Sequence, residues 1–272
     1  MMRKLALTVL FLLAIGARPA AAQTCSLTVT AMSFGTYTGA LLNGTATGKV
    51  TCAGGWDIPL NAGTGAGATE TVRKMTGPGG AELSYEVYQD AARTINWGNT
   101  TGTELTGTGN ATVTFYGQIT AGQYVVPGTY TDTLSTATTD FTVTAIVQAT
   151  CLISAGNLAF GTYTGALINS TSTISVTCTN TTPYNVGLNA GTATGATVTT
   201  REMKGPGSGL LGYSLYQNST HTTNWGNTVG TDTEPGTGTG SVQSLTVYGQ
   251  VPLGQFPAPG AYSDTITATL TY

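Results

Sequence analysis

The chain has 272 residues, with 9 Lys or Arg, 12 Asp or Glu and a formal net charge of −3. Charged residues make up 8% of it, against about 25% in ordinary soluble domains, so the clustered basic residues that bind nucleic acid are absent. An apolar content of 40% excludes a disordered chain or a coiled coil, which need more charge. At about 150 residues per domain, the length fits one large or two small domains.

The first 22 residues have the pattern of a secretory signal peptide. Arg3 and Lys4 precede an apolar run over 5–15, and three alanines at 20–22 predict cleavage before Gln23. The apolar run is shorter than the roughly 20 residues needed to span a bilayer, and no later segment is apolar enough to do so. We therefore expect an exported protein without a transmembrane segment in its mature chain.

The mature chain contains one sequence pattern twice. Residues 34–41, Phe-Gly-Thr-Tyr-Thr-Gly-Ala-Leu, return unchanged at 160–167, and Asn-Trp-Gly-Asn-Thr at 96–100 returns at 224–228. The offset between the copies grows from 126 (151 − 25) to 132 (262 − 130), which short loop insertions explain. We expect two tandem domains, at 23–140 and 150–272, joined by a segment at 141–149.

Within each copy, short runs rich in Thr, Val, Tyr and Ile alternate apolar and polar positions between clusters of Gly, Pro and Asn. This pattern is typical of an antiparallel β-sandwich. The clearest run closes the chain and places Ile266, Ala268, Leu270 and Tyr272 on one face. The predicted fold class is all-β, with two tandem sandwiches.

Each copy contains two cysteines 27 residues apart. In an exported protein they predict the disulfides Cys25–Cys52 and Cys151–Cys178. Three pairings are formally possible, and the symmetry of the repeat favours the intradomain one. A metal site is the alternative, but two cysteines without neighbouring histidines are a poor zinc ligand set, so we predict no metal and no cofactor.

No catalytic constellation is evident, and we predict that the chain is not an enzyme. His221 lies in a polar loop without a nucleophile nearby, which indicates a solvated residue. Asp132 and Asp264 recur one per copy, which favours a structural role for each carboxylate over a catalytic pair. Trp97 and Trp225 are either sugar-stacking platforms or packing residues, and their shared Asn-Trp-Gly-Asn context favours packing.

The succession of these motifs resembles the spore coat protein U domain. The shared features are a cysteine before Phe-Gly-x-Tyr, a second cysteine 27 residues later, an Asn-Trp-Gly turn, Tyr-Gly-Gln, and a closing Pro-Gly-x-Tyr-x-Asp-Thr strand. Most members of that family resemble subunits of archaic chaperone–usher pili of Gram-negative bacteria, and two-domain members resemble tip adhesins. The resemblance implies immunoglobulin-like, pilin-type sandwiches that lack their last strand.

The same resemblance implies the partners and the location. A periplasmic chaperone fills the gap first, an outer-membrane usher assembles the fibre, and a neighbouring pilin subunit then supplies its N-terminal extension. The C-terminal strand with Ile266, Ala268, Leu270 and Tyr272 is the segment that the chaperone is expected to recognise. The protein is expected in the periplasm in transit and then on the cell surface, in a pilus.

The connecting segment has the alternation that a donor strand requires, with Phe141, Val143, Ala145 and Val147 on one face. It is either a linker with the first strand of copy two, or the last strand of copy one, completed in cis. The second interpretation is favoured, because an unfilled groove would expose a long hydrophobic edge. In the predicted mature chain only two residues precede Cys25 and none follows Tyr272, so we expect copy two to be filled by another protein and the chain to end a fibre.

The leading functional hypothesis is thus a non-enzymatic, two-domain tip adhesin, with copy one outermost. A secreted carbohydrate-binding module and a structural coat protein are the alternatives. In copy one, Tyr124, Val125 and Val126 form a candidate adhesive loop, an exposed apolar tip, unless they pack under their own loop.

Overall fold

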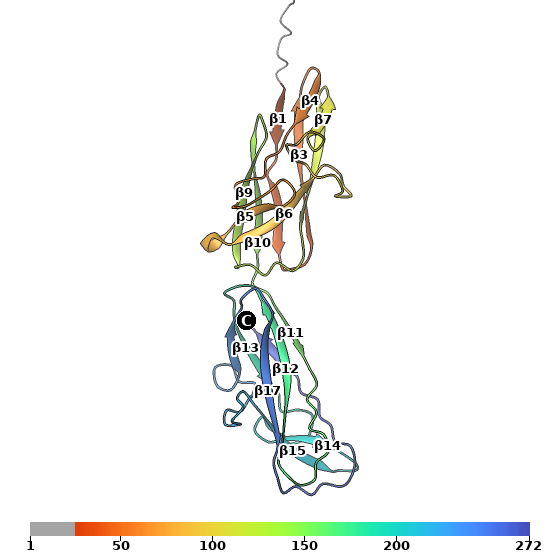
Figure 1. Ribbon diagram of the computed structural model, residues 1–272, viewed down its shortest axis with the longest axis vertical. Coiled ribbons are helices and arrows are strands. Elements are labelled where there is room, and N and C mark those ends of the chain that lie inside the picture. Colours follow the sequence, from red (N-terminus) through yellow and green to blue (C-terminus); the bar gives the residue numbers. More distant parts are fainter. Residues whose placement is uncertain (1–24) are drawn as a thin grey trace, which may run out of the picture.

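The computed structural model describes residues 25–272, and the predicted signal peptide lies outside the described residues. The described chain contains 18 strands and one turn of 3₁₀ helix at Pro78–Gly80, and none of its helices could cross a membrane. Two β-sheet bodies lie end to end, joined by the passage from β10 to β11 (Figure 1). The all-β, two-domain prediction is confirmed.

Ten strands form the first domain. They are β1 (Ser26–Val29), β2 (Met32–Tyr37), β3 (Leu42–Thr51), β4 (Gly55–Ile58), β5 (Arg73–Thr76), β6 (Glu82–Tyr88), β7 (Leu105–Thr108), β8 (Ala111–Ile119), β9 (Gly128–Ser135) and β10 (Asp140–Val147). Eight of them are joined in the order β1-β3-β8-β6-β5-β9-β10-β2, and β4 pairs with β7. The two ends of this sheet face each other across one hydrophobic core.

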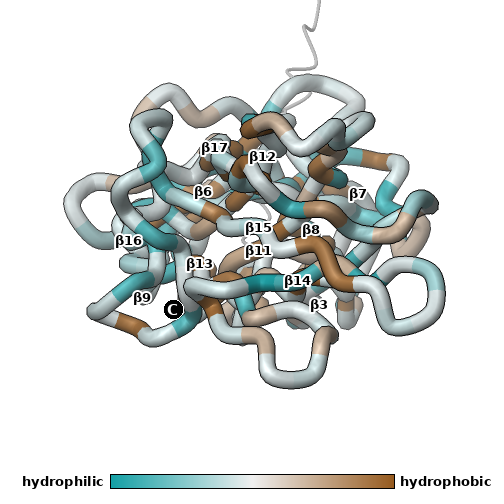
Figure 2. Tube along the Cα trace, turned by 90° about the horizontal axis from the view of Figure 1, so that it is seen from below, coloured by the Kyte–Doolittle hydropathy of each residue, from teal (hydrophilic) through white to brown (hydrophobic). Residues whose placement is uncertain are grey.

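Alternation along the strands builds that core. In β3, β6 and β10 every second residue is buried or half-buried, as expected where one face of a sheet is covered. The Phe34 ring of β2 lies against β8 at Gly117, where a Cβ atom would come within 2.6 Å of both Phe34 Cζ and Met32 Sδ. Only glycine permits this close approach. Seen along the long axis, hydrophobic residues lie mainly inside and pale or hydrophilic residues follow the outer loops (Figure 2).

Eight strands form the second domain. They are β11 (Cys151–Ala155), β12 (Ile168–Cys178), β13 (Pro183–Leu188), β14 (Arg201–Lys204), β15 (Leu210–Tyr216), β16 (Glu234–Thr237), β17 (Gln243–Val251) and β18 (Ala268–Thr271). The main sheet has the order β11-β12-β17-β15-β14, and β16-β13-β18 form a smaller sheet. The main sheet repeats β1-β3-β8-β6-β5 of the first domain and stops there.

Candidate functional site

In the first domain, β10 lies between β9 and β2. It pairs antiparallel with β9 over eight residues, from Asp140 opposite Ser135 to Val147 opposite Gly128, and parallel with β2 from Val143 opposite Met32. The alternate side chains that face the core are buried, with exposed fractions of 5% or less: Phe141, Val143, Ala145 and Val147. The Phe141 ring stacks near Trp97 and Phe115, each at a centroid distance of 6.4 Å.

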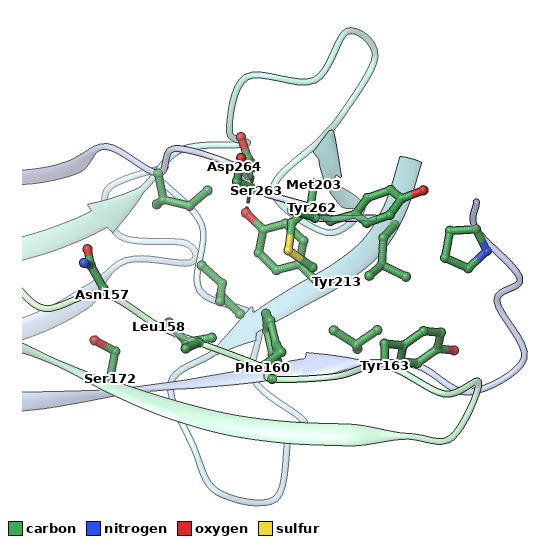
Figure 3. Close-up of a pocket in the computed structure, with 18 of the residues that line it drawn as sticks. Asn157, Leu158, Phe160, Tyr163, Ser172, Met203, Tyr213, Tyr262, Ser263 and Asp264 are labelled. Carbon is green, nitrogen blue, oxygen red and sulfur yellow. Dashed lines mark hydrogen bonds between the residues drawn. The ribbon is translucent and has the colours of Figure 1, made fainter. Parts of the chain in front are cut away.

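The second domain has no strand at the equivalent place. Segment 158–163, the counterpart of β2, belongs to no strand ladder, and the counterpart of β9 at 260–267 keeps only the bridge between Lys204 and Ser263. Between these two segments lies a groove with a volume of about 1100 Å³ (Figure 3). Its floor consists of apolar side chains of the sheets, including Ile174, Leu188, Leu211, Leu215, Val247 and Val251.

The groove walls are positioned as in the first domain but are less covered. The Phe160 and Leu158 side chains still cross β17 at Gly249, where a Cβ atom would come within 2.9 Å of each of them. However, wall residues whose counterparts in the first domain are buried are only half-buried here. The pairs, each with the buried residue of the first domain given first, are Met32 and Leu158, Phe34 and Phe160, Tyr37 and Tyr163, Tyr130 and Tyr262, and Leu134 and Ile266. The groove is therefore an apolar site from which one strand is missing.

A carboxylate fixes the long wall of the groove to the sheet behind it. Asp264 Oδ1 accepts hydrogen bonds from the N–H and hydroxyl of Thr192, both at 2.8 Å, and Oδ2 accepts one from the Tyr213 hydroxyl at 2.7 Å. Burial opposes ionisation of Asp264, but these hydrogen bonds outweigh it and lower the pKa of the carboxyl. Asp132 makes the same contacts with Thr64 and Tyr85. Both aspartates hold structure together.

A buried arginine supports the floor in each domain. The Arg201 guanidinium donates to the carbonyl oxygens of Leu188, Asn189, Val198 and Trp225 at 2.6–2.9 Å, and burial lowers its pKa to about 10. Arg73 is its counterpart and is fully buried. Sequence reasoning missed both arginines, although Arg-x-Met-x-Gly-Pro-Gly stands at 73–79 and again at 201–207.

Both tryptophans of the repeated turn are packing residues. Trp97 and Trp225 are 0% and 1% exposed, and each indole N–H donates to a backbone carbonyl at 2.8 Å, of Ile58 and Val186 respectively. Neither ring face is available for a sugar. His221 is half-buried, in edge contact with Tyr216 at 5.3 Å, because its loop folds back over β15 and β17; it is not the solvated residue that we expected.

The C-terminal strand flanks the groove. β18 pairs antiparallel with β13, and Leu270 lies opposite Val186. Ile266, Ala268 and Leu270 pack partly buried on the core of the second domain, whereas Tyr272 is 58% exposed. The alternating face that we expect a chaperone to recognise is thus continuous with the open groove.

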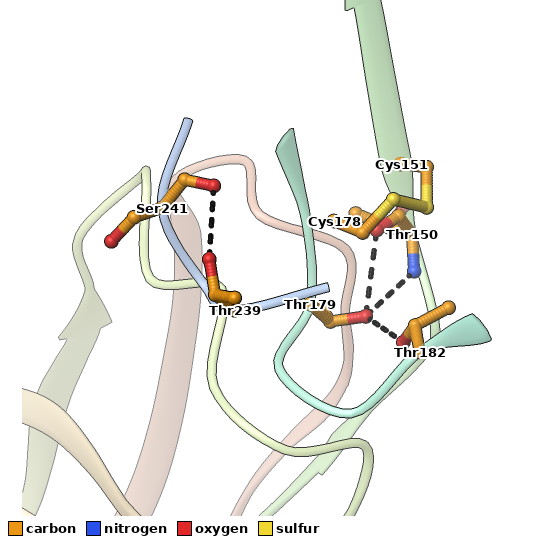
Figure 4. The surroundings of a disulfide bond; sticks show 7 residues. All are labelled: Thr150, Cys151, Cys178, Thr179, Thr182, Thr239 and Ser241. Atoms are coloured by element: carbon orange, nitrogen blue, oxygen red, sulfur yellow. Dashed lines mark hydrogen bonds between the residues drawn. A yellow bond between two sulfur atoms is a disulfide. The ribbon is translucent and has the colours of Figure 1, made fainter. Parts of the chain in front are cut away.

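The disulfides Cys25–Cys52 and Cys151–Cys178 close each domain at one end. In the second domain the two cysteines are directly opposite in the β11–β12 ladder. Beside them, Thr179 Oγ1 accepts a hydrogen bond from the Thr150 N–H at 3.1 Å and lies 2.6 Å from Thr182 Oγ1 (Figure 4). No group of three or more His, Cys, Asp and Glu side chains within residues 25–272 is arranged to hold a metal ion.

The candidate adhesive loop does not lie at a free end. The Tyr124 carbonyl accepts a hydrogen bond from the Asn180 N–H of the second domain at 2.9 Å, and Val125 packs on the core of the first domain. The Tyr124, Val125 and Val126 side chains are all half-buried. This position differs from the exposed tip that we predicted, because the β8–β9 connection runs toward β11, at the junction of the two domains.

Fold and groove together define a class: a pair of immunoglobulin-like β-domains, of which the first is complete and the second lacks its last strand. Residues 11–137 and 136–269 each match the Spore Coat Protein U domain, and the chain belongs to this family. It is 37% identical to Protein U of Myxococcus xanthus over 145 residues, which cover 47% of this chain and 80% of that protein.

Among solved structures, the chain is similar to the CsuC–CsuE chaperone–tip adhesion subunit pre-assembly complex of archaic Csu pili from Acinetobacter baumannii. The TM-score is 0.54 at 17% identity, and the match covers 92% of this chain and 100% of the other. The CupB6 tip adhesin of Pseudomonas aeruginosa matches at 13% identity with a TM-score of 0.35, over 91% and 94% of the two chains. At 17% identity, the likeness to the Csu structure concerns the fold alone.

Proposed function

We propose that this protein is a non-enzymatic, two-domain adhesion subunit at the tip of a chaperone–usher pilus, and that its second domain accepts a strand from a neighbouring subunit. The observation that carries the proposal is the unequal completion of two copies of one domain. The first contains β10, and the second has an open apolar groove at the same place.

The strand β10 of the first domain indicates what the groove of the second domain binds. β10 forms a ladder with β9 over eight residues and a shorter one with β2 from Val143 to Val147, and it buries every second side chain. Strand addition of this kind takes its affinity from backbone hydrogen bonds and its specificity from alternate side-chain pockets. Each large apolar side chain that becomes fully buried contributes about 1.5–3 kcal/mol. The incoming segment is accordingly an extended strand with apolar residues at alternate positions.

The partners follow from the groove and from the relatives. An open groove of this size exposes apolar surface that must be covered before assembly, and a periplasmic chaperone is the first occupant that we propose. The similar Csu protein is named as a tip adhesion subunit in a complex with a chaperone. An outer-membrane usher and a neighbouring pilin complete the set. The two disulfides agree with an extracytoplasmic location.

The proposed place at the tip rests on the first domain. Its groove is occupied by its own chain, so of the two domains only the second has room for a strand from outside. Immunogold labelling of fibres should find the protein once, at the distal end. Regular labelling along the shaft would contradict the tip assignment, and labelling of a cell or spore coat without fibres would favour the structural coat protein.

Strand acceptance can be tested with the β10 sequence itself. We would extend the chain beyond Tyr272 by a short flexible linker and the sequence of residues 140–147. Expressed in the periplasm without other subunits, the unextended chain should aggregate or be degraded, whereas the extended chain should accumulate as a soluble monomer.

The matched control carries the same extension with Asp at the positions of Val143 and Ala145, and it should behave like the unextended chain. If the unextended chain is already a stable monomer and the extension changes neither yield nor thermal stability, the groove is not a strand acceptor.

A further inference from the structure

The junction between the two domains is a defined contact. The Gln148 N–H donates to the Tyr37 carbonyl of the first domain at 3.0 Å, and the Thr179 N–H donates to the Thr150 carbonyl at 2.9 Å within the second. Of the three residues between β10 and β11, only Ala149 makes no such backbone hydrogen bond to either domain. The connection therefore holds the end loops of the two domains against each other.

The contact across the junction is made by the β8–β9 loop of the first domain. The Tyr124 carbonyl accepts the hydrogen bond from Asn180, and it also lies against Gly240, where a Cβ atom would come within 2.8 Å of the carbonyl oxygen. A larger residue at 240 would therefore push the two domains apart.

The two loops that receive Tyr124 are longer in the second domain than in the first. Between the second cysteine and the next matched aromatic residue, the first domain has three residues (53–55) and the second has five (179–183). The Gly-Thr-Gly segment at 107–109 matches the one at 236–238. One residue, at 110, separates it from β8 in the first domain, whereas four residues, at 239–242, separate it from β17 in the second. Both insertions lie at the end of the second domain that faces the first.

The far end of the second domain repeats the surface on the first domain that contacts these loops. Phe256 takes the place of Tyr124 and lies over Gly165, as Tyr124 lies over Gly39. The glutamine before each aromatic residue is fixed in the same way in both copies. The Gln123 N–H donates to the Tyr37 hydroxyl, and the Gln255 N–H donates to the Tyr163 hydroxyl, both at 3.1 Å. Yet Phe256 is 91% exposed, whereas Tyr124 is half-buried at the junction.

We propose that this end surface, formed by Phe256 with the exposed Leu253 and Leu167, is a docking site for the neighbouring subunit whose strand fills the groove. Its occupant is the loop that follows the second cysteine of that subunit's domain, the counterpart of 179–182. The inference rests on the proposed function. It adds that the neighbouring subunit inserts its strand and docks against the end surface together. The junction between the two domains of this chain is the example on which this arrangement is based.

The pattern also constrains the neighbour's sequence. In this chain β10 ends at Val147, and three residues separate it from Cys151, the first residue of β11. A strand inserted in the same register, followed by an equally short connection, brings the first cysteine of the neighbour and its adjoining loops to Phe256. A long flexible connection would not fix this contact.

Site-specific photo-crosslinking in fibre-forming cells that express the full chain tests the docking site. A benzophenone amino acid is placed at Phe256 on the end surface, at Thr162 in the groove wall, and at Leu152, which is 56% exposed on β11, as a matched control. Peptide mapping identifies what each position captures.

We expect the Thr162 and Phe256 probes to capture the same subunit, through its N-terminal strand and through the loop after its second cysteine, respectively, and the Leu152 probe to capture neither. If Thr162 captures a subunit and Phe256 captures nothing or another region, the docking inference is overturned and the strand-acceptor function stands. If neither position captures a subunit, both are overturned.

Discussion

Replacing Phe141 by alanine should destabilise the first domain selectively, if β10 is an integral strand of it. The ring is 5% exposed and stacks near Trp97 and Phe115. Removing a buried phenylalanine side chain costs about 3–5 kcal/mol, because the transfer free energy is lost and a cavity remains. At about 4 °C per kcal/mol for a domain of this size, the melting temperature of the first domain should fall by about 12–20 °C.

Scanning calorimetry of the chain with the C-terminal β10 extension, which we expect to be a soluble monomer, measures the effect. Tryptophan fluorescence followed in parallel reports mainly on the first domain, since two of the three tryptophans, Trp56 and Trp97, lie there. The transition of the second domain should not move. The matched control is Thr142→Ala, an exposed position on the same strand, which should change stability by no more than about 0.5 kcal/mol. Equal and small shifts for Phe141→Ala and Thr142→Ala would refute the view that β10 completes the first domain.

Three further predictions concern stability. Because hydrogen bonds hold the folded-state pKa of Asp264 below its ordinary value of 3.8, its ionised form stabilises the second domain, and this contribution should be lost as the pH falls through the folded-state pKa. Asp264→Asn should flatten that loss of stability in a pH series of urea melts. An unchanged dependence of stability on acid pH would contradict this. Arg201→Lys should destabilise the second domain by about 3 kcal/mol, because one ammonium cannot replace a guanidinium bonded to four carbonyl groups; a urea-midpoint change as small as that of Lys204→Arg would contradict it. Reducing the two disulfides, each closing a loop with a sequence separation of 27 residues, should cost each domain about 3–4 kcal/mol, and thermal melts with and without reductant measure the loss.

Much of the architecture could be predicted from the sequence, because the repeat supplies its own alignment. Alternation along the strands gave the fold class, and the symmetry of the cysteines gave the same pairing that the structure contains. These features are local or repeated, and they do not depend on how the two copies are arranged.

Three features could not be predicted because they depend on tertiary partners. The segment Phe-Gly-Thr-Tyr is part of a strand at 34–37 and is outside any strand at 160–163, since only the first has a neighbouring strand to pair with. Arg73 and Arg201 carry charge in a chain with few charged residues, and nothing local indicates that carbonyl groups will surround them. The Tyr124 loop is apolar in sequence, but only the path of the chain decides that it meets the second domain.

The identical octapeptides at 34–41 and 160–167 permit the most direct test of the central claim, that the second domain awaits a strand which the first already contains. Seven of the eight amide pairs, from Gly35 and Gly161 onward, have the same flanking residues, so hydrogen exchange in the chain refolded at high dilution, which limits its aggregation, compares structure alone. We predict strong protection at 34–37, fast exchange at 160–163, and equal protection of both segments once the chain carries the C-terminal extension with the β10 sequence. Equal protection of the two segments in the unextended chain would contradict the account.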